Sequence, residues 1–102
     1  MTNDLYKPLA HPIRRRVIER LAEGPATVGE ATRETGVSKP TLSKHLQILE
    51  EAGLISRVVS GRTHRLSLQV DALRPASEWI DEQRRRWEGL FGAVESYLEE
   101  HA

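Results

Sequence analysis

The sequence predicts a mainly α-helical fold that includes a small β-hairpin. Apolar residues recur at helical spacing before residue 52 and again after residue 71, and strand-forming residues flank a glycine turn between these two regions. At 102 residues, with 38% hydrophobic and 29% charged residues, the chain has the length and balance of one folded domain, which we expect to span residues 1–102.

Two helices are expected before residue 25. Leu5, Tyr6 and Leu9 indicate a short leading helix. The second helix begins at His11-Pro12, because proline is favoured at the first helical position, and it ends at Gly24-Pro25.

A tight glycine turn separates the next two helices. Thr27 and Glu30 match a capping box, in which a hydroxyl and a carboxylate bind free amides at a helix start, and this helix stops at Gly36. Ser38 can cap the following helix, which Gly53 ends. Helix, tight turn and helix is the pattern that places a second helix in the major groove of DNA.

A two-stranded ribbon and a long helix complete the predicted fold. Residues 55–59 and 62–68 are rich in strand formers, and Ser60-Gly61 between them supplies a residue that adopts positive φ in a tight hairpin. From residue 71 to residue 100 the apolar residues return to helical spacing. The prediction is therefore a winged helix-turn-helix with five helices and a two-stranded wing.

The helix between Ser38 and Glu51 has two different faces. At about 100° per residue, Leu42, Leu46 and Leu49 form a narrow stripe that we expect to face the core. The opposite face is polar and cationic. Residues 37–68 contain five Lys or Arg and two Asp or Glu, whereas residues 69–102 contain four and eight. The formal net charge of zero therefore hides a basic middle and an acidic end.

A basic helix face next to a basic hairpin fits double-stranded DNA, whose phosphates attract cations along the whole duplex. Lysine and glutamine suit base edges, hydroxyls suit phosphates, and we expect the hairpin to contribute affinity more than sequence discrimination. The candidate DNA-binding residues are Ser38, Lys39, Pro40, Thr41, Ser43, Lys44, Gln47, Arg57, Arg62, His64 and Arg65. The alternative is an ordinary solvated amphipathic helix. For the run from Arg14 to Arg16 we favour a solvated face.

The segment 71–100 is expected to be a long C-terminal dimerisation helix. Four of the five aromatic residues lie in it, and aromatic side chains are favoured anchors of buried interfaces. The alternative is that its tryptophans cover the domain's own core, but so long a helix cannot be buried fully against so small a body. The candidate interface residues are Leu5, Tyr6, Leu9, Leu73, Ile80, Trp87, Phe91, Val94 and Leu98. A twofold dimer implies an inverted-repeat operator.

The composition excludes several kinds of function. The chain has no cysteine, so it forms no disulfide, thiolate metal site or thiol redox switch. No run approaches the roughly 18 apolar residues of a membrane span, and the N-terminal residues lack the apolar core of a secretory signal, so we expect a cytoplasmic protein without membrane contact. The sequence offers no glycine-rich phosphate loop and no supported nucleophile set, so we expect neither enzyme activity nor a cofactor.

The stretch from Leu9 to Leu68 resembles the winged-helix repressors of the ArsR/SmtB family. The resemblance is carried by LAHPIRRRVIERLAEGPATVGEA, SKPTLSKHLQILEEAGLI and SGRTHRLSL, and DALRPASEWIDEQRRRWE and YLEE resemble the last helix of members without metal sites. MarR-type and other winged-helix regulators share parts of this pattern. The resemblance implies a homodimer, a recognition helix from Ser38 to Glu51, and repression by occluding a promoter until an effector lowers the affinity for DNA.

The chain departs from the metal-sensing members of that family. Where the arsenic and cadmium sensors carry a Cys-Val-Cys motif, this chain has Thr27, Val28 and Gly29, which cannot bind a soft metal. The family's other metal site uses Asp and His ligands on paired C-terminal helices, and the only histidine of this last helix is His101, near the end of the sequence. We therefore expect no metal site, and the effector remains unknown.

The leading hypothesis is a sequence-specific, double-stranded DNA-binding transcriptional regulator that acts as a homodimeric repressor. The alternative hypothesis, from another class, is a winged-helix protein-interaction module without DNA binding. The sequence identifies neither the operator nor the target genes, and it leaves repression and activation both open.

Overall fold

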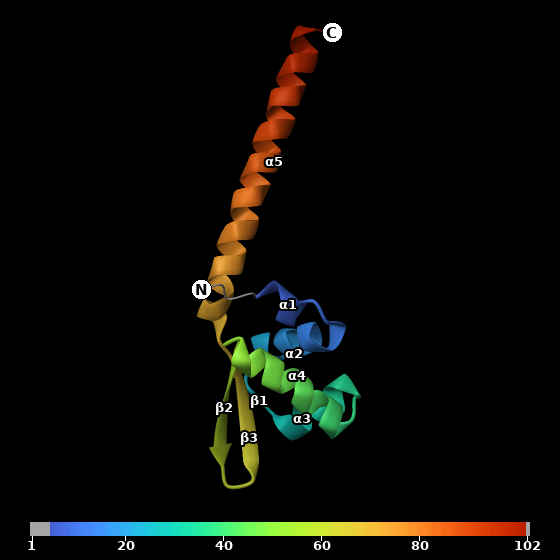
Figure 1. The fold of residues 1–102 in the computed structure, drawn as a ribbon, viewed down its shortest axis with the longest axis vertical. Helices are drawn as coiled ribbons and strands as arrows, with labels where there is room; N and C mark the ends of the chain where they lie inside the picture. Colours follow the sequence, from blue (N-terminus) through green and yellow to red (C-terminus); the bar gives the residue numbers. More distant parts are fainter. Residues whose placement is uncertain (1–4, 102) are drawn as a thin grey trace.

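The computed structural model describes residues 5–101, which form an elongated molecule of 70 × 30 × 21 Å. Short helices and a small sheet make up a body, from which the last helix projects away (Figure 1). The elements are α1 Tyr6–Leu9, α2 Pro12–Ala22, β1 Ala26–Thr27, α3 Val28–Thr35, α4 Lys39–Glu51, β2 Ile55–Ser60, β3 Thr63–Leu68, the 3-10 helix η1 Val70–Leu73 and α5 Arg74–Glu100.

Helices α2, α3 and α4 begin where the local sequence signals predict, whereas α5 begins at Arg74 rather than at residue 71 because residues 70–73 form a 3-10 helix. The His11 Nδ1 atom accepts from the backbone N–H of the second residue of α2, at 3.1 Å. The capping box at the start of α3 is complete, and the amide and hydroxyl of Thr27 hold the pKa of the Glu30 carboxyl below its usual 4.5. Gly36 ends α3 with φ at 71°, a left-handed conformation that favours glycine, and Ser38 caps α4.

The sheet has three strands, so the prediction of a two-stranded wing is incomplete. β2 and β3 form the expected antiparallel hairpin, in register from Ile55 opposite Leu68 to Ser60 opposite Thr63. The additional strand β1 pairs antiparallel with β3, giving the order β1-β3-β2. A strand of two residues, the second of which is itself the cap of α3, is too short to show the alternation that marks a strand in sequence. β1 ties the hairpin to the start of α3.

The core confirms the predicted leucine stripe. Leu42, Leu46 and Leu49 are fully buried, and they pack in one cluster with buried apolar residues of α2, β2 and β3. Burying one such side chain contributes roughly 1.5–3 kcal/mol. These three residues therefore hold α4 in one orientation about its axis and leave its opposite face in solvent.

The last helix behaves differently from the rest of the fold. Residues 70–73 form a 3-10 turn, and α5 then runs for 27 residues with Ala76 as its only buried residue among the described positions. Its exposed large apolar residues are Trp79, Ile80, Trp87, Leu90, Phe91, Val94, Tyr97 and Leu98. Within residues 5–101, no helix, α5 included, has an apolar stretch sufficient to cross a membrane.

Candidate DNA-binding surface

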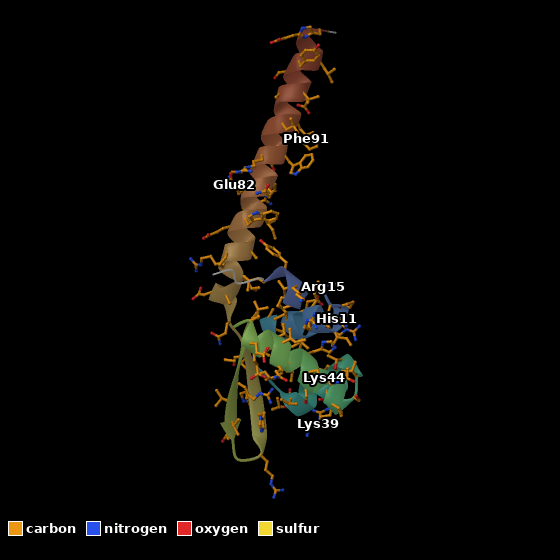
Figure 2. The ribbon with its side chains drawn as sticks, viewed as in Figure 1. His11, Arg15, Lys39, Lys44, Glu82 and Phe91 are labelled. Atoms are coloured by element: carbon orange, nitrogen blue, oxygen red, sulfur yellow. The ribbon has the colours of Figure 1, made fainter. Side chains whose placement is uncertain are left out.

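The outer face of α4 presents a continuous set of polar side chains to solvent. Because leucines occupy the buried stripe, the candidate residues Ser38, Lys39, Pro40, Thr41, Ser43, Lys44 and Gln47 are all exposed, as are Ile48 and Glu51. Figure 2 labels the two lysines of this face on α4. The Gln47 amide donates to the Glu51 carboxylate at 3.1 Å, and the Ser38 and Thr41 hydroxyls are bonded to each other at 2.9 Å.

The hairpin adds two exposed arginines to this surface. Arg62 follows Gly61, whose φ of 62° forms the tight turn, and Arg65 lies on the outer face of β3. Side chains alternate along β3, since Leu66 is fully buried whereas Thr63 and Arg65 are exposed. The tip of the hairpin therefore carries cations away from the body.

A groove of about 500 Å³ lies between α3, α4 and the hairpin. It contains five of the candidate DNA-binding residues, namely Lys39, Ser43, Arg57, Arg62 and His64. The rest of its lining is Thr27, Val28, Gly29, Thr32 and Thr63, which sequence reasoning did not select. The start of α3 lies in the groove because β1 pairs with β3, a contact that the sequence does not signal. Lys44, Gln47 and Arg65 lie outside the groove.

Arg57 and His64 are engaged inside the protein. Arg57 forms an ion pair with Glu50 of α4, and its Nη1 atom lies 3.2 Å from the His64 Nδ1 atom. A guanidinium group only donates hydrogen bonds, so Nδ1 is the acceptor in this contact. Arg57 thus connects the hairpin to α4, and His64 contacts Arg57 from the neighbouring strand.

The remaining cations of the surface are unpaired. Lys39, Lys44, Arg62 and Arg65 form no ion pair and no side-chain hydrogen bond with any residue in the range 5–101. Four free cations on one helix and the adjacent hairpin attract a polyanion, and the attraction falls with salt.

In the arginine run of α2, Arg15 and Arg16 are exposed, as a solvated face requires, but all three arginines also donate hydrogen bonds to backbone oxygens. Arg14 donates to the backbone oxygens of Lys7 and Pro8, Arg15 to that of Leu9, and Arg16 to that of Thr35. Carbonyls at helix ends lack helical partners, and cations there are stabilising. The run therefore anchors the ends of α1 and α3 to α2.

A second histidine contact lies between α2 and α4. The rings of His11 and His45 are 4.4 Å apart, and the Arg14 guanidinium lies 3.1 Å from the His45 Nδ1 atom. Burial lowers the pKa of His45 below its usual 6.5, and nearby His11 and Arg14 lower it further. Across residues 5–101, His, Asp and Glu form no cluster of three or more that could hold a metal ion.

The candidate interface residues fall into two groups. Tyr6, Ile80, Trp87, Phe91, Val94 and Leu98 are exposed. Leu5 is instead buried in the core of its own chain, and Leu9 and Leu73 pack against that core. The short α1 turns Leu5 inward and Tyr6 outward, where the Tyr6 ring meets the Trp79 ring edge-on at 5.7 Å.

The fold and this surface define a winged helix-turn-helix DNA-binding protein. A family model described as a helix-turn-helix domain matches residues 9–58. The chain is 32% identical over 78 residues to the transcriptional repressor SdpR of Bacillus subtilis, covering 76% of this chain and 87% of that protein. It is 40% identical over 52 residues to the biofilm growth-associated repressor of Xylella fastidiosa, covering 51% of this chain and 46% of that protein.

Solved structures give the same assignment. The crystal structure of an ArsR family transcriptional regulator has a TM-score of 0.74 and 34% sequence identity to this chain, covering 81% of this chain and 86% of that one. The chain belongs to the ArsR family of winged helix-turn-helix transcriptional regulators. The absence of cysteine separates it from members that bind metals through thiolates.

Proposed function

We propose that this protein is a homodimeric transcriptional repressor that binds an inverted-repeat operator in double-stranded DNA. The observation that carries the proposal is that Lys39 of α4 and Arg62 of the wing, both unpaired within residues 5–101, line the same groove. Lys44 and Arg65, also unpaired in that range, are exposed on the same two elements outside the groove. A convex helix and a projecting hairpin with free positive charge match a groove and its flanking phosphates.

The members of this surface are assigned different roles. Lys44 and Gln47, which lie on the outer face of α4, reach base edges in the major groove, where glutamine pairs bidentately with adenine. Arg62 and Arg65 bind the DNA backbone or the minor groove. The residues at the start of α4 hold phosphate through their hydroxyls, a lysine and free backbone amides, and they are Ser38, Lys39, Pro40, Thr41 and Ser43.

The exposed face of α5 is proposed to pair with a second copy of the chain. Trp87 and Phe91 are 58% and 57% exposed, and their rings pack at 5.7 Å one turn apart. Apolar residues continue along the helix to Leu98, and Figure 2 shows Phe91 on the part of α5 far from the body. A contiguous apolar face of this length is typical of an interface. Apart from the contact of Tyr6 with Trp79, no part of residues 5–101 covers it.

A twofold dimer accounts for the distribution of charge. α5 and the β2-β3 hairpin leave the body in opposite directions (Figure 1), so an α5 interface keeps the acidic end of the chain away from DNA. Two copies of α4 would then meet successive major grooves about 34–36 Å apart. That spacing predicts an operator with two inverted half-sites.

Repression is proposed from the relatives. SdpR and the Xylella fastidiosa protein are both named repressors. A dimer bound across a promoter excludes RNA polymerase without any further activity of the protein.

The direct test is binding to the DNA upstream of the protein's own gene, measured by gel shift, with sedimentation of the free protein and of the complex. We expect a dimer that binds one duplex, and a footprint made of two inverted half-sites. A protein that dimerises through α5 and ignores DNA would instead be the protein-interaction module that the apolar face of α5 also fits.

A further inference from the structure

We propose that Glu50, Arg57 and His64 form a brace that fixes the angle between the recognition helix α4 and the wing. The three residues come from the last turn of α4, from β2 and from β3. The proposal rests on the DNA-binding function proposed above, and it makes Arg57 and His64 positioning residues rather than phosphate contacts.

The contacts of the brace converge on one guanidinium group. The Arg57 Nη2 atom donates to Glu50 Oε1, and Nη1 donates to His64 Nδ1 at 3.2 Å. The side chains of Arg57 and Glu50 are only 26% and 32% exposed. Hydrogen bonds between charged groups are about twice as strong as neutral ones, and partial burial protects them from screening. With two of its nitrogens bonded, Arg57 is held between α4 and the hairpin.

The register of the hairpin explains why a polar brace occurs here. Arg57 lies opposite Leu66, and residues directly opposite in a sheet share a face, so Arg57 and His64 are on the same inner face as Ile55 and Leu66. Near the body this face is buried in the core through Ile55 and Leu66. Further out the groove replaces the core, and Val59, the next apolar side chain on this face, is exposed. The ion pair and the histidine bond take the place of the core there.

The negative charge of Glu50 makes the direction of the expected change in DNA affinity informative. Glu50 and Glu51 are the only acids in residues 37–68, on the helix that faces DNA, where a negative charge opposes binding. Glu51 is exposed and bonds only to Gln47 among residues 5–101, whereas the Glu50 carboxylate forms an ion pair with Arg57. If charge alone matters, removing either carboxylate strengthens DNA binding. If Glu50 positions the wing, its removal weakens binding.

The test compares Glu50→Ala, Arg57→Ala and the double variant with the matched control Glu51→Ala. The probe is a fluorescent duplex that the wild-type protein selects from a random-sequence pool, and the dissociation constant is measured over a range of salt concentrations. We expect Glu50→Ala to bind about tenfold more weakly, as for the loss of one coupled pair. The double variant should bind no more weakly than Arg57→Ala, and Glu51→Ala should bind as well as wild type or better.

Thermal melting of each variant separates positioning from folding. We expect every variant to be folded at the binding temperature, and Glu50→Gln, which keeps an acceptor oxygen without the charge, to lose less affinity than Glu50→Ala. Tighter binding by Glu50→Ala, as by Glu51→Ala, would overturn the inference. The inference would also be overturned if the affinity losses of Glu50→Ala and Arg57→Ala added in the double variant and Arg57→Ala alone lowered the salt slope by about one. Arg57 would then contact a phosphate. Failure of the wild-type protein to select any duplex would refute the proposed function instead.

Discussion

The cations of the candidate DNA-binding surface differ from those of α5 in whether they are paired with acids. Lys39, Lys44, Arg62 and Arg65 have no acidic partner among residues 5–101. Each arginine of the 3-10 turn and α5 region is bonded to an acid one turn earlier, in the pairs Arg74–Asp71, Arg84–Asp81, Arg85–Glu82 and Arg86–Glu82. The absence of acidic partners, rather than the number of cations, therefore distinguishes a surface suited to a polyanion.

The paired arginines contribute little to stability but remove attraction for DNA. Exposed ion pairs within one helix contribute about 0.3–0.5 kcal/mol each. Hydrogen bonds from Arg85 and Arg86 lower the pKa of Glu82, so this carboxylate stays charged and its partners stay neutralised. α5 thus presents an apolar stripe flanked by paired arginines and an excess of acids, which favours a protein partner over nucleic acid.

The largest expected effect comes from breaking the apolar stripe of α5. In Trp87→Ala combined with Phe91→Ala, we expect monomers in sedimentation and an operator affinity lower by roughly 10²–10⁴, because the second half-site no longer binds as an intramolecular step. Wild-type sedimentation and affinity in this variant would exclude α5 as the dimer interface.

The matched control for this variant changes two exposed charges on the same helix. Arg84→Ala combined with Arg85→Ala removes two side chains that bond only to acids of their own helix. This variant should remain a dimer and bind the operator as wild type does. A monomeric control would mean that α5 responds to any substitution, and the contrast with the aromatic pair would be lost.

The next effect sharpens the comparison of free and paired arginines directly. Arg62→Ala combined with Arg65→Ala should lower the slope of log K against log salt by about two, since each phosphate contact contributes about 0.9 to it. The loss of affinity should be similar for operator and unrelated duplexes. The control variant Arg84→Ala plus Arg85→Ala, which removes two paired arginines, should show the wild-type slope. A wing variant that changes the preferred sequence would contradict the division of roles proposed here.

Gln47 separates sequence preference from charge on the same surface. Gln47→Ala should reduce discrimination at one base pair of each half-site by about 1–3 kcal/mol and leave the salt slope unchanged. The measurement is selection from a randomised duplex pool by both proteins. Gln83→Ala on α5 is the control and should select the wild-type operator. A uniform loss across all sequences would assign Gln47 to the DNA backbone.

Local signals in the sequence predict most of the fold. The caps at Thr27 and Ser38 act on backbone groups within one turn, and the stripe of Leu42, Leu46 and Leu49 is set by the helical repeat, so both are readable from neighbours in sequence. The strand Ala26–Thr27 is not, because its partner lies near residue 66.

The candidate surface is only partly predictable for the same reason. Sequence places Arg57 and Arg65 in one class, as basic residues of the hairpin. The structure separates them, since Arg57 reaches Glu50 on α4 whereas Arg65 faces outward. Likewise Arg16 bonds to the carbonyl of Thr35, which is 19 residues away in sequence. The state of an arginine thus depends on which element folds next to it, and residue type and spacing do not contain that information.

The smallest expected effect concerns a third arginine environment, in which Arg14 faces a histidine instead of an acid or solvent. The pKa of His45 is lowered in the folded protein, so below about pH 6.5 the unfolded chain binds a proton that the folded protein does not. The contribution of His45 to stability is therefore fully present above pH 6.5. It falls as the pH drops toward the lowered pKa of the folded protein, by at most about 1.4 kcal/mol per pH unit.

Urea unfolding at pH 7.5 and pH 5.5, at one fixed protein concentration, measures this loss, and the wild-type protein is compared with His45→Gln. Glutamine keeps an acceptor oxygen for Arg14 but does not titrate. The variant should lose less stability than wild type between the two pH values, because it lacks the titrating group. The carboxyls of Glu30 and Glu82, whose pKa values are lowered from 4.5, do not account for a difference between the two proteins. Equal losses in the two proteins would show that the contact of His45 with Arg14 and His11 does not link stability to pH.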